Sequence, residues 1–180
     1  PANMFELSNG DYIMVFHSLT FGINSNLFAQ RYNSSGVLQW TSPIQLSNYG
    51  TVFNRTYEGL QDGDIVYMGY TASPGSRFDS FLQRIDPDGT LPWGINGSDF
   101  ADNQTDYEMD TTIAFDEESD YIWSSCNYTN SSQSEKGEYI QKFDKETGAR
   151  MFSNNAKEIF PIGSEKVHAG SIYLLNDSPL

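Results

Sequence analysis

Residues 29–40 read AQRYNSSGVLQW, residues 82–93 read LQRIDPDGTLPW, and residues 140–152 read IQKFDKETGARMF. The first two copies lie 53 residues apart, and their Gln, Arg, Gly and Trp coincide. The third has one extra turn residue and ends in Phe instead of Trp. Each copy predicts a strand, a turn and a returning strand, with the glycine at the positive-φ position of the turn.

A second hairpin precedes each of these copies. Residues 5–16, FELSNGDYIMVF, match residues 58–68, EGLQDGDIVYM, again at an offset of 53. Asn-Gly and Asp-Gly are strong signals for two-residue hairpin turns. The third version runs over residues 111–123 with a turn at 116–119, and a fourth begins at residues 167–175. The sequence therefore predicts units of four antiparallel strands in two hairpins.

Four-stranded units of about 50 residues are typical of β-propeller blades. We therefore expect an all-β chain that forms a partial propeller. Tandem β-sandwich modules are the alternative, but they need longer periods and more strands per unit. The expected boundaries are residues 4–56 for blade 1, 57–107 for blade 2 and 108–163 for blade 3, with the first hairpin of a fourth blade at 164–180.

Three and a half blades are too few for a closed ring, because closed propellers typically have four to eight. The last hairpin would also leave an open strand edge. We therefore expect that the 180 residues are a segment of a longer protein, or that a neighbouring copy completes them.

The DKETGARMF segment at residues 144–152 resembles the tryptophan-docking repeat of quinoprotein-like propellers. That pattern has an Asp, a Thr-Gly shortly after it, and an aromatic residue four positions after the Gly. The second copy keeps Asp86, Gly89 and Trp93, whereas the first has Asn33 in place of the Asp. The resemblance implies that the aromatic residue locks neighbouring blades together, which predicts inter-blade packing for Trp40, Trp93 and Phe152. The quinone-binding residues of that family have no match here, so no cofactor is expected.

The chain is strongly acidic. Ten Lys and Arg residues face 24 Asp and Glu residues, which gives a net charge of −14 and a pI near 4.2. Such a field repels nucleic acid and anionic lipid. No apolar run reaches the 18 residues of a membrane span, and the mean hydropathy is −0.51. We therefore expect no nucleic-acid partner and no membrane insertion.

Asn-x-Ser/Thr acceptor sequences are frequent, and most fall in expected turns or loops. This pattern predicts a glycoprotein of the secretory pathway, although Asn and Ser also gather in turns for conformational reasons. The seven candidate acceptors are Asn33, Asn54, Asn96, Asn103, Asn127, Asn130 and Asn176.

Metal and catalytic motifs give weaker signals. The acidic stretches at residues 86–89 and 116–120 are fragments of calcium loops without the full ligand pattern, so no metal site is expected. His17 and His168 lie far apart in the sequence, and the single cysteine, Cys126, is expected to be a buried strand residue. Because no nucleophile or phosphate-loop motif occurs, we expect no enzymatic activity and no catalytic residue.

These observations predict a secreted or cell-surface scaffold for structural assembly or protein–protein interaction. Its partners would be other protein chains or copies of itself, bound at the loops of the blade ends. The first alternative is a lectin-like propeller, since aromatic residues beside Asp and Asn suit sugars. The aromatic residues considered for this role are Tyr49, Phe53, Tyr57, Phe78 and Tyr128. A propeller hydrolase is the second alternative.

Overall fold

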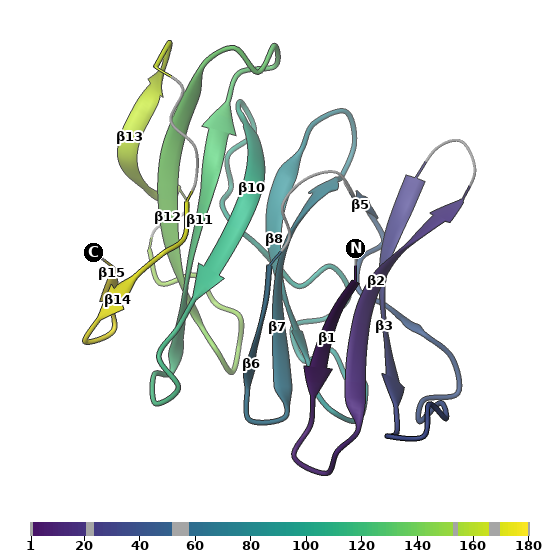
Figure 1. Cartoon of the computed structure of the whole chain (residues 1–180). Helices are drawn as coiled ribbons and strands as arrows, with labels where there is room; N and C mark the ends of the chain where they lie inside the picture. Colours follow the sequence, from purple (N-terminus) through teal and green to yellow (C-terminus); the bar gives the residue numbers. More distant parts are fainter. Residues whose placement is uncertain (1, 21–23, 52–57, 153–154, 166–169, 180) are drawn as a thin grey trace.

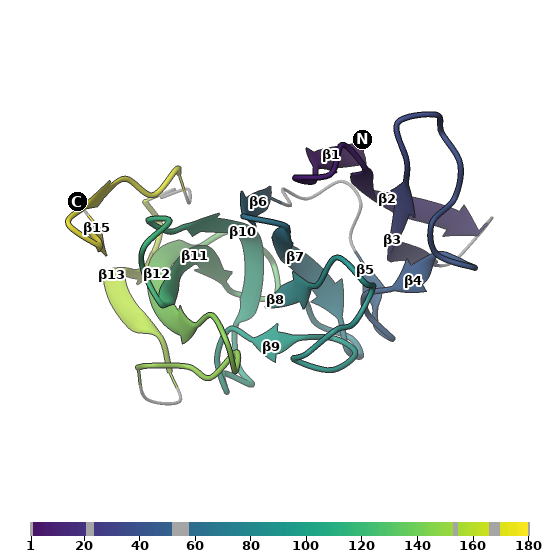
Figure 2. The same ribbon diagram turned by 90° about the horizontal axis from the view of Figure 1, so that it is seen from below.

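The computed structural model describes residues 2–20, 24–51, 58–152, 155–165 and 170–179, and every regular element among them is a β-strand. Three antiparallel four-stranded blades stand side by side along the chain (Figure 1). Seen from below, they fan out from β1, β6 and β10 toward β4, β9 and β13 (Figure 2). This is the arrangement of neighbouring blades in a propeller, so the chain has an all-β, propeller-type fold.

The strands follow the same order in each blade. Blade 1 contains β1 (Ala2–Glu6), β2 (Tyr12–Thr20), β3 (Asn24–Tyr32) and β4 (Ile44–Gln45). Blade 2 contains β6 (Glu58–Asp62), β7 (Ile65–Ser73), β8 (Asp79–Ile85) and β9 (Ser98–Asp99). Blade 3 contains β10 (Tyr107–Ala114), β11 (Tyr121–Thr129), β12 (Lys136–Asp144) and β13 (Lys157–Gly163). A final hairpin of β14 (Leu174–Leu175) and β15 (Ser178–Pro179) lies beside blade 3.

Blades 1 and 2 are connected within one sheet. The short strand β5 (Gly50–Thr51) pairs with β3 through Thr51 and Ser25, and with β7 through Thr51 and Ala72. Blade 3 forms a separate sheet. The joint between blades 1 and 2 therefore includes strand pairing through β5, whereas blades 2 and 3 belong to separate sheets. The side-chain contacts at the two joints are nevertheless of the same kind.

The hydrophobic core lies between the blades and not within them. One cluster joins blades 1 and 2 and includes Ile13, Val15 and Met68. A second joins blades 2 and 3 and includes Tyr67, Ile122 and Phe143. Successive residues of β7 thus pack against opposite neighbours, which explains why the whole segment from Val66 to Ala72 is buried.

The same contacts recur at both joints between blades. Trp40 Nε1 of blade 1 donates to Pro87 O of blade 2 at 3.3 Å, and Trp93 Nε1 of blade 2 donates to Glu146 O of blade 3 at 3.1 Å. A Cβ placed on Gly89 would lie 3.2 Å from Trp40, and one on Gly148 would lie 2.8 Å from Trp93. Glycine is therefore needed at these turns both for its positive φ and for the close approach of an indole.

Phe152 behaves differently from the two tryptophans. It packs against Trp123, with 5.7 Å between ring centroids, and Lys157 Nζ lies 4.1 Å from the centre of its ring. Both partners belong to blade 3, Trp123 in β11 and Lys157 in β13. The structure thus places Phe152 in a contact within its own blade, where an inter-blade contact was expected.

Two details of the repeat differ from the sequence comparison. The segment after each glycine turn was expected to be a returning strand, but it forms only the isolated bridges Tyr32–Leu38 and Phe143–Arg150. The chain bends there to direct the aromatic side chain at position 40 or 93 toward the next blade, and the outer strand forms only later.

The second detail concerns the register of the first hairpin. The sequence comparison pairs Ile13 with Val66, but Ile13 lies opposite Arg31, and it is Tyr67 that lies opposite Arg84. Because the two arginines are equivalent, the offset in this strand is 54 and not 53. A shift of one residue exchanges the two faces of a strand, so it decides which side chains face which blade.

Candidate functional site

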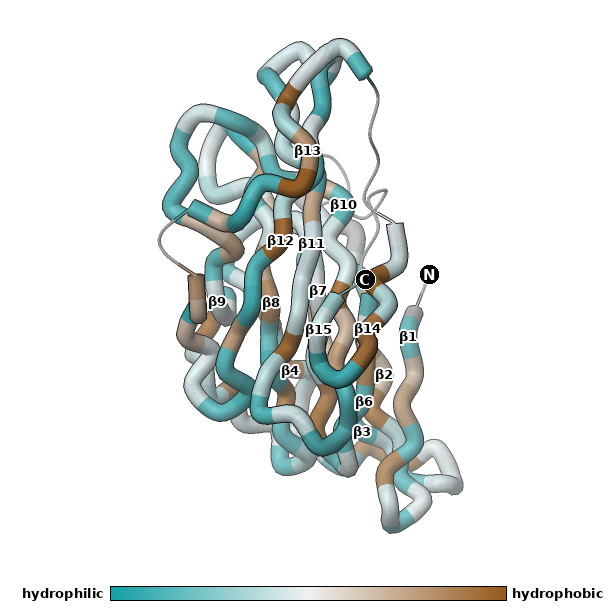
Figure 3. The backbone as a smooth tube through the Cα atoms, turned by 90° about the vertical axis from the view of Figure 1, so that its left-hand side faces the viewer, coloured by the Kyte–Doolittle hydropathy of each residue, from teal (hydrophilic) through white to brown (hydrophobic). Residues whose placement is uncertain are grey.

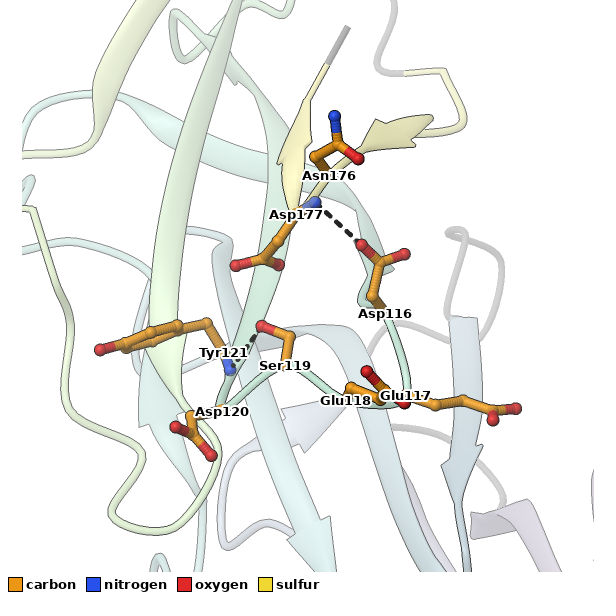
Figure 4. Close-up of a pocket in the computed structure, with 8 residues that line it drawn as sticks. All are labelled: Asp116, Glu117, Glu118, Ser119, Asp120, Tyr121, Asn176 and Asp177. Atoms are coloured by element: carbon orange, nitrogen blue, oxygen red, sulfur yellow. Dashed lines mark hydrogen bonds between the residues drawn. The ribbon is translucent and has the colours of Figure 1, made fainter.

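All the hairpin turns that the sequence predicts gather at one end of the blades, which we call the turn end (lower end in Figure 1). The turn between β10 and β11 carries the acidic residues Asp116, Glu117, Glu118 and Asp120 on exposed positions. Ser119 N donates to Asp116 O at 3.0 Å, and Tyr121 N donates to Ser119 Oγ at 3.1 Å. These local hydrogen bonds fix the turn, and the side chain of Glu117 extends away from it (Figure 4).

The β14–β15 hairpin closes one side of this turn. Asp177 N donates to Asp116 Oδ2 at 2.9 Å, and Trp123 Nε1 donates to Asp177 O at 3.0 Å. A cavity of about 620 Å³ lies between the turn and the hairpin. Figure 4 shows its lining: Asp116, Glu117, Glu118, Ser119, Asp120, Tyr121, Asn176 and Asp177. We call this the turn-end cavity.

A second hollow of about 590 Å³ lies on the blade 2 side of the same turn, where Arg84 and Lys145 add two cations. Both are already paired. Lys145 Nζ lies 2.6 Å from Asp62 Oδ2 and also donates to Asp116 O at 3.3 Å, and Arg84 Nε lies 2.7 Å from Asp86 Oδ1. These cations therefore neutralise Asp62 and Asp86 and leave the acidic character of residues 116–120 intact.

The turn-end cavity offers many hydrogen-bond acceptors, which suits a cationic or hydroxyl-rich ligand. Hydrogen bonds from Thr147 N and Oγ1, both 2.7 Å, hold the pKa of nearby Asp144 below its ordinary value, so this carboxylate also stays charged. The ring of Tyr121 is less available, because Lys142 Nζ lies 4.1 Å from its centroid. The cavity is therefore built for charge and hydrogen bonding more than for stacking.

A second group of acids lies buried between blades 2 and 3, toward the end opposite the turns. Glu108 is fully buried, and its Oε2 accepts a hydrogen bond from Ser80 N at 3.2 Å. Burial, together with the carboxylates of Asp99 and Asp79, raises the pKa of Glu108 well above its ordinary value. Burial also raises the pKa of Asp99 to about 6, with Asp79 adding to the effect. Neither of the two hollows at the turn end is lined by this group.

The predicted glycan acceptors fall into three groups. Asn33, Asn96, Asn103 and Asn130 are partly exposed in turns or loops, and Asn176 is exposed at the rim of the turn-end cavity. Asn54 lies outside the described residues. Asn127 is fully buried in β11, where its Nδ2 donates to Glu138 Oε2 at 3.0 Å. A glycan on Asn127 is incompatible with this fold, and that prediction is wrong.

The aromatic residues proposed as sugar platforms do not form one surface. Tyr128 is buried at 4% exposure and stacks on Tyr139, while Tyr49 packs against the core of blades 1 and 2. Phe78 contacts Tyr107 edge-on, and Phe53 and Tyr57 lie outside the described residues. The expectation of an exposed platform is therefore wrong for Tyr128.

The remaining single residues lie within strands. Cys126 is fully buried in β11, as expected. His17 lies on β2 with its Nδ1 3.2 Å from Thr51 Oγ1, and burial lowers its pKa to about 4. His168 lies outside the described residues. Among the described residues, no group of three His, Cys, Asp or Glu side chains is arranged to hold a metal ion.

The repeated glutamines are structural residues whose role the sequence comparison did not identify. Gln83 Nε2 donates to Leu46 O of blade 1 at 3.2 Å, and Gln141 Nε2 donates to Phe100 O at 3.4 Å, in the segment that follows blade 2. Each also accepts the backbone N–H of the residue after it. The sequence could have indicated this structural role, because a glutamine occurs at the same position of all three copies, as Gln30, Gln83 and Gln141.

The comparisons with known proteins give a likeness to solved structures. No family model and no curated protein matches the chain. The fold is similar to the solved structure of an endo-1,5-alpha-L-arabinanase from Thermotoga petrophila RKU-1, with a TM-score of 0.45 and 14% sequence identity. The match covers 82% of this chain but only 37% of the arabinanase.

This finding corrects the expectation that the chain has no enzymatic activity. The solved structure named above is that of an enzyme, and a fold by itself neither assigns nor excludes catalysis. The likeness concerns the fold alone and assigns no catalytic residue to this chain. In the described residues there is no helix long and apolar enough to cross a membrane.

Proposed function

We propose that this chain is an extracellular, glycosylated propeller-type scaffold that binds a basic segment of another protein in its turn-end cavity. The observation that carries the proposal is the cavity between the 116–120 turn and the β14–β15 hairpin. It has the size of a ligand site, and its lining includes Glu117 and Glu118, both of which are exposed.

Electrostatics supports a cationic partner. The net charge of −14 attracts basic chains over a long range, and the cavity concentrates that charge at one end of the blades. One cation contacts the lining itself, because Lys142 Nζ lies 3.3 Å from Asp177 Oδ2, while Lys145 and Arg84 are held by Asp62 and Asp86. An incoming lysine or arginine would therefore meet the exposed carboxylates of Glu117 and Glu118, which take part in none of these ion pairs.

The glycoprotein part of the proposal rests on the accessible acceptors. The turn hydrogen bonds of Asn33 and Asn96 use Oδ1, whereas a glycan is attached to Nδ2. Both side chains can thus serve the turn and carry a sugar. Removal of N-linked glycans from the native protein should lower its mass, and an unchanged mass would contradict this part.

We further propose that the repeats are of the quinoprotein-like, tryptophan-docking type. The support is the pairing of Trp40 with the Gly89 turn and of Trp93 with the Gly148 turn. The Phe at position 152 is the departure from that pattern.

The binding experiment uses a heptalysine peptide as the probe. Isothermal titration calorimetry measures its affinity for the chain at low and at physiological salt. The Glu117→Gln/Glu118→Gln variant should bind about 10-fold more weakly than the unchanged chain, and added salt should weaken both. The matched control is Glu135→Gln/Glu165→Gln, which removes two exposed charges elsewhere. Equal loss in both variants would mean that net charge alone binds the peptide, which contradicts a specific site.

A carbohydrate ligand is the second candidate. The carboxylates and the Asn176 amide of the same cavity can bond sugar hydroxyls, and its volume suits a small oligosaccharide. Glycan-array binding that the Glu117→Gln/Glu118→Gln variant abolishes, without heptalysine binding, would favour this candidate over the first.

A further inference from the structure

A residue that contacts both blades stands at each joint, and we call it the crossing residue. Between blades 1 and 2 it is Thr51, which pairs with β3 and with β7. Between blades 2 and 3 it is Glu108 of β10, which pairs with Tyr128 of β11 and whose backbone N donates to Phe78 O of blade 2 at 2.8 Å. Blade 3 faces the viewer in Figure 3, with β10, β11 and β12 side by side.

The partners of the two crossing residues correspond to each other in the repeat. Thr51 pairs with Ser25, and Phe78 lies at the matching place, because each precedes the repeated glutamine of its blade by five residues. Thr51 also pairs with Ala72, which matches Tyr128, because each stands four residues after the residue opposite a repeated glutamine. The fold therefore places a carboxyl at the second joint where the first has a hydroxyl.

The two side chains differ in how well the joint satisfies them. The Thr51 hydroxyl is neutral, donates to Ser25 O at 2.9 Å and lies 3.2 Å from His17 Nδ1. Glu108 is fully buried, and its Oε2 accepts from Ser80 N at 3.2 Å. Its Oε1 is buried as well and has no hydrogen-bond partner among the described residues. An ionised carboxylate at this place would lack the contacts that replace water.

The groups around Glu108 also favour its neutral form. The charged groups that act on it most strongly are acids, Asp79 of β8 and Asp99 of β9. From β11, Tyr128 Oη interacts with the carboxyl without reaching hydrogen-bond geometry, and the thiol of Cys126 lies in the same joint. Burial and the two carboxylates raise the pKa of Glu108 well above its ordinary value, so the packed joint holds a protonated acid.

The cations at this end of the blades are held by other acids. Arg77 Nε donates to Asp79 Oδ1 at 2.6 Å, and Arg150 Nη2 lies 2.5 Å from Asp102 Oδ1. On β12, burial raises the pKa of Tyr139 to about 12, so this hydroxyl stays neutral at physiological pH. A cation to compensate an ionised Glu108 is therefore not among the side chains that act most strongly on it.

We propose that Glu108 is a proton-operated latch, which keeps blades 2 and 3 packed while its carboxyl carries a proton and lets the joint open when the proton is lost. The joint can open by itself because blades 2 and 3 belong to separate sheets, whereas β5 ties blades 1 and 2 within one sheet. The packed joint binds the proton more tightly than the open joint does. Packing is therefore favoured below the ordinary pKa of a glutamic acid and weakens as the pH rises through the raised pKa.

The single cysteine of the chain reports on this joint. Cys126 is fully buried there, so methyl methanethiosulfonate labels it when the blades separate. At each pH the labelling rate of the unchanged chain is divided by that of Glu108→Gln, whose amide stays neutral and still accepts from Ser80 N. The thiol chemistry and the titration of His17 and Asp99 are common to both chains. The ratio should rise at least about 10-fold between about pH 5 and 9, and a ratio independent of pH would overturn the proposal.

The matched control moves the thiol to the other joint. In Val15→Cys/Cys126→Ala the cysteine stands at a fully buried position between blades 1 and 2. Its labelling rate, divided by that of the same variant with Glu108→Gln, should stay constant over this pH range. An equal rise at both joints would mean that the whole chain unfolds, which overturns the latch.

A second variant keeps the test decisive if Glu108→Gln does not fold. Asp99→Asn removes a negative charge that acts on Glu108, so Cys126 should become accessible at a lower pH than in the unchanged chain. An unshifted profile would contradict the latch.

Discussion

Blade 1 and blade 2 have similar sequences but different surroundings. Blade 2 has a neighbour on both faces, so β7 is buried from Val66 to Ala72. Blade 1 has a neighbour on one face only, so β2 alternates between buried and partly exposed residues. The comparison shows that a side chain in this fold becomes buried when an adjacent blade covers it. The residues of its own blade do not bury it by themselves.

The largest expected effect comes from deleting an equivalent ring in each blade. Tyr70→Ala should cost about 3–5 kcal/mol, because it empties a site 1% exposed and removes the hydrogen bond from Tyr70 Oη to Asn96 O. Phe16→Ala, at the corresponding position of blade 1, should cost about 1–2 kcal/mol. Urea unfolding measures both, and equal costs would mean that both faces of blade 1 are covered.

Alanine at the turn glycines should give the next largest difference. Gly148→Ala and Gly36→Ala both place a side chain at positive φ, which costs about 1 kcal/mol. Only at Gly148 does the new Cβ also press on neighbouring side chains, namely Ser98 Oγ and the indole of Trp93 at 2.8 Å, which should add about 1–2 kcal/mol. The difference between the two variants in thermal unfolding measures these two contacts together, and no difference would argue against the close packing of blade 2 on the Gly148 turn.

The inter-blade glutamines provide a smaller contrast. Gln83→Ala should cost about 1–2 kcal/mol, because it removes the hydrogen bonds that Gln83 Nε2 donates to Leu46 O and Gly94 O. Gln30 donates to Trp40 O at 3.4 Å, within its own blade, so Gln30→Ala should cost less. Denaturant titration of the two variants side by side decides this point.

The smallest expected effect is a pH dependence of the joint between blades 2 and 3. The folded chain raises the pKa of Asp99 to about 6 by burial, so it binds a proton more tightly than the unfolded chain does. This stabilisation is complete below about pH 4 and is lost as the pH rises through 6, by about 1 kcal/mol after allowance for solvent screening.

The buried Glu108 adds to this pH dependence in the same direction. His17 acts in the opposite direction between about pH 4 and 6.5, because burial lowers its pKa to about 4. The test is therefore the difference in unfolding free energy between the unchanged chain and Asp99→Asn, which should shrink as the pH rises from 4 to 8. A difference that does not change with pH would contradict the assignment.

The sequence was sufficient to predict three of the four strands of each blade and the places where the chain turns. The turns at Asn9-Gly10 and Asp62-Gly63 and the burial of Cys126 follow from local patterns, whereas the outer strand forms later than the returning strand that was expected. The register was not predictable in the same way, because the loop over residues 7–11 is longer than the turn after Asp62 and shifts β2 by one position relative to β7. That shift determines which residues form the core.

The candidate site needed the three-dimensional arrangement. Residues 116–120 stood out in the sequence only as a possible metal loop, and Asn176 only as a glycan acceptor. They line one cavity because the β14–β15 hairpin docks on Trp123 and Asp116, and no local pattern announces that contact. The prediction of a glycan on Asn127 was wrong for a related reason. Asn127 is buried, and an acceptor sequence gives no information about burial.

Hydroxyl-radical footprinting of the dilute, monomeric chain tests the arrangement of the blades most directly. Met14 and Met68 occupy equivalent positions, as do Phe28 and Phe81, so each pair compares the same chemistry in two surroundings. The account predicts faster oxidation at Met14 and Phe28, on the uncovered face, than at Met68 and Phe81, which are exposed by 0% and 4%. Equal rates within each pair would contradict the packing of blade 2 against blade 1.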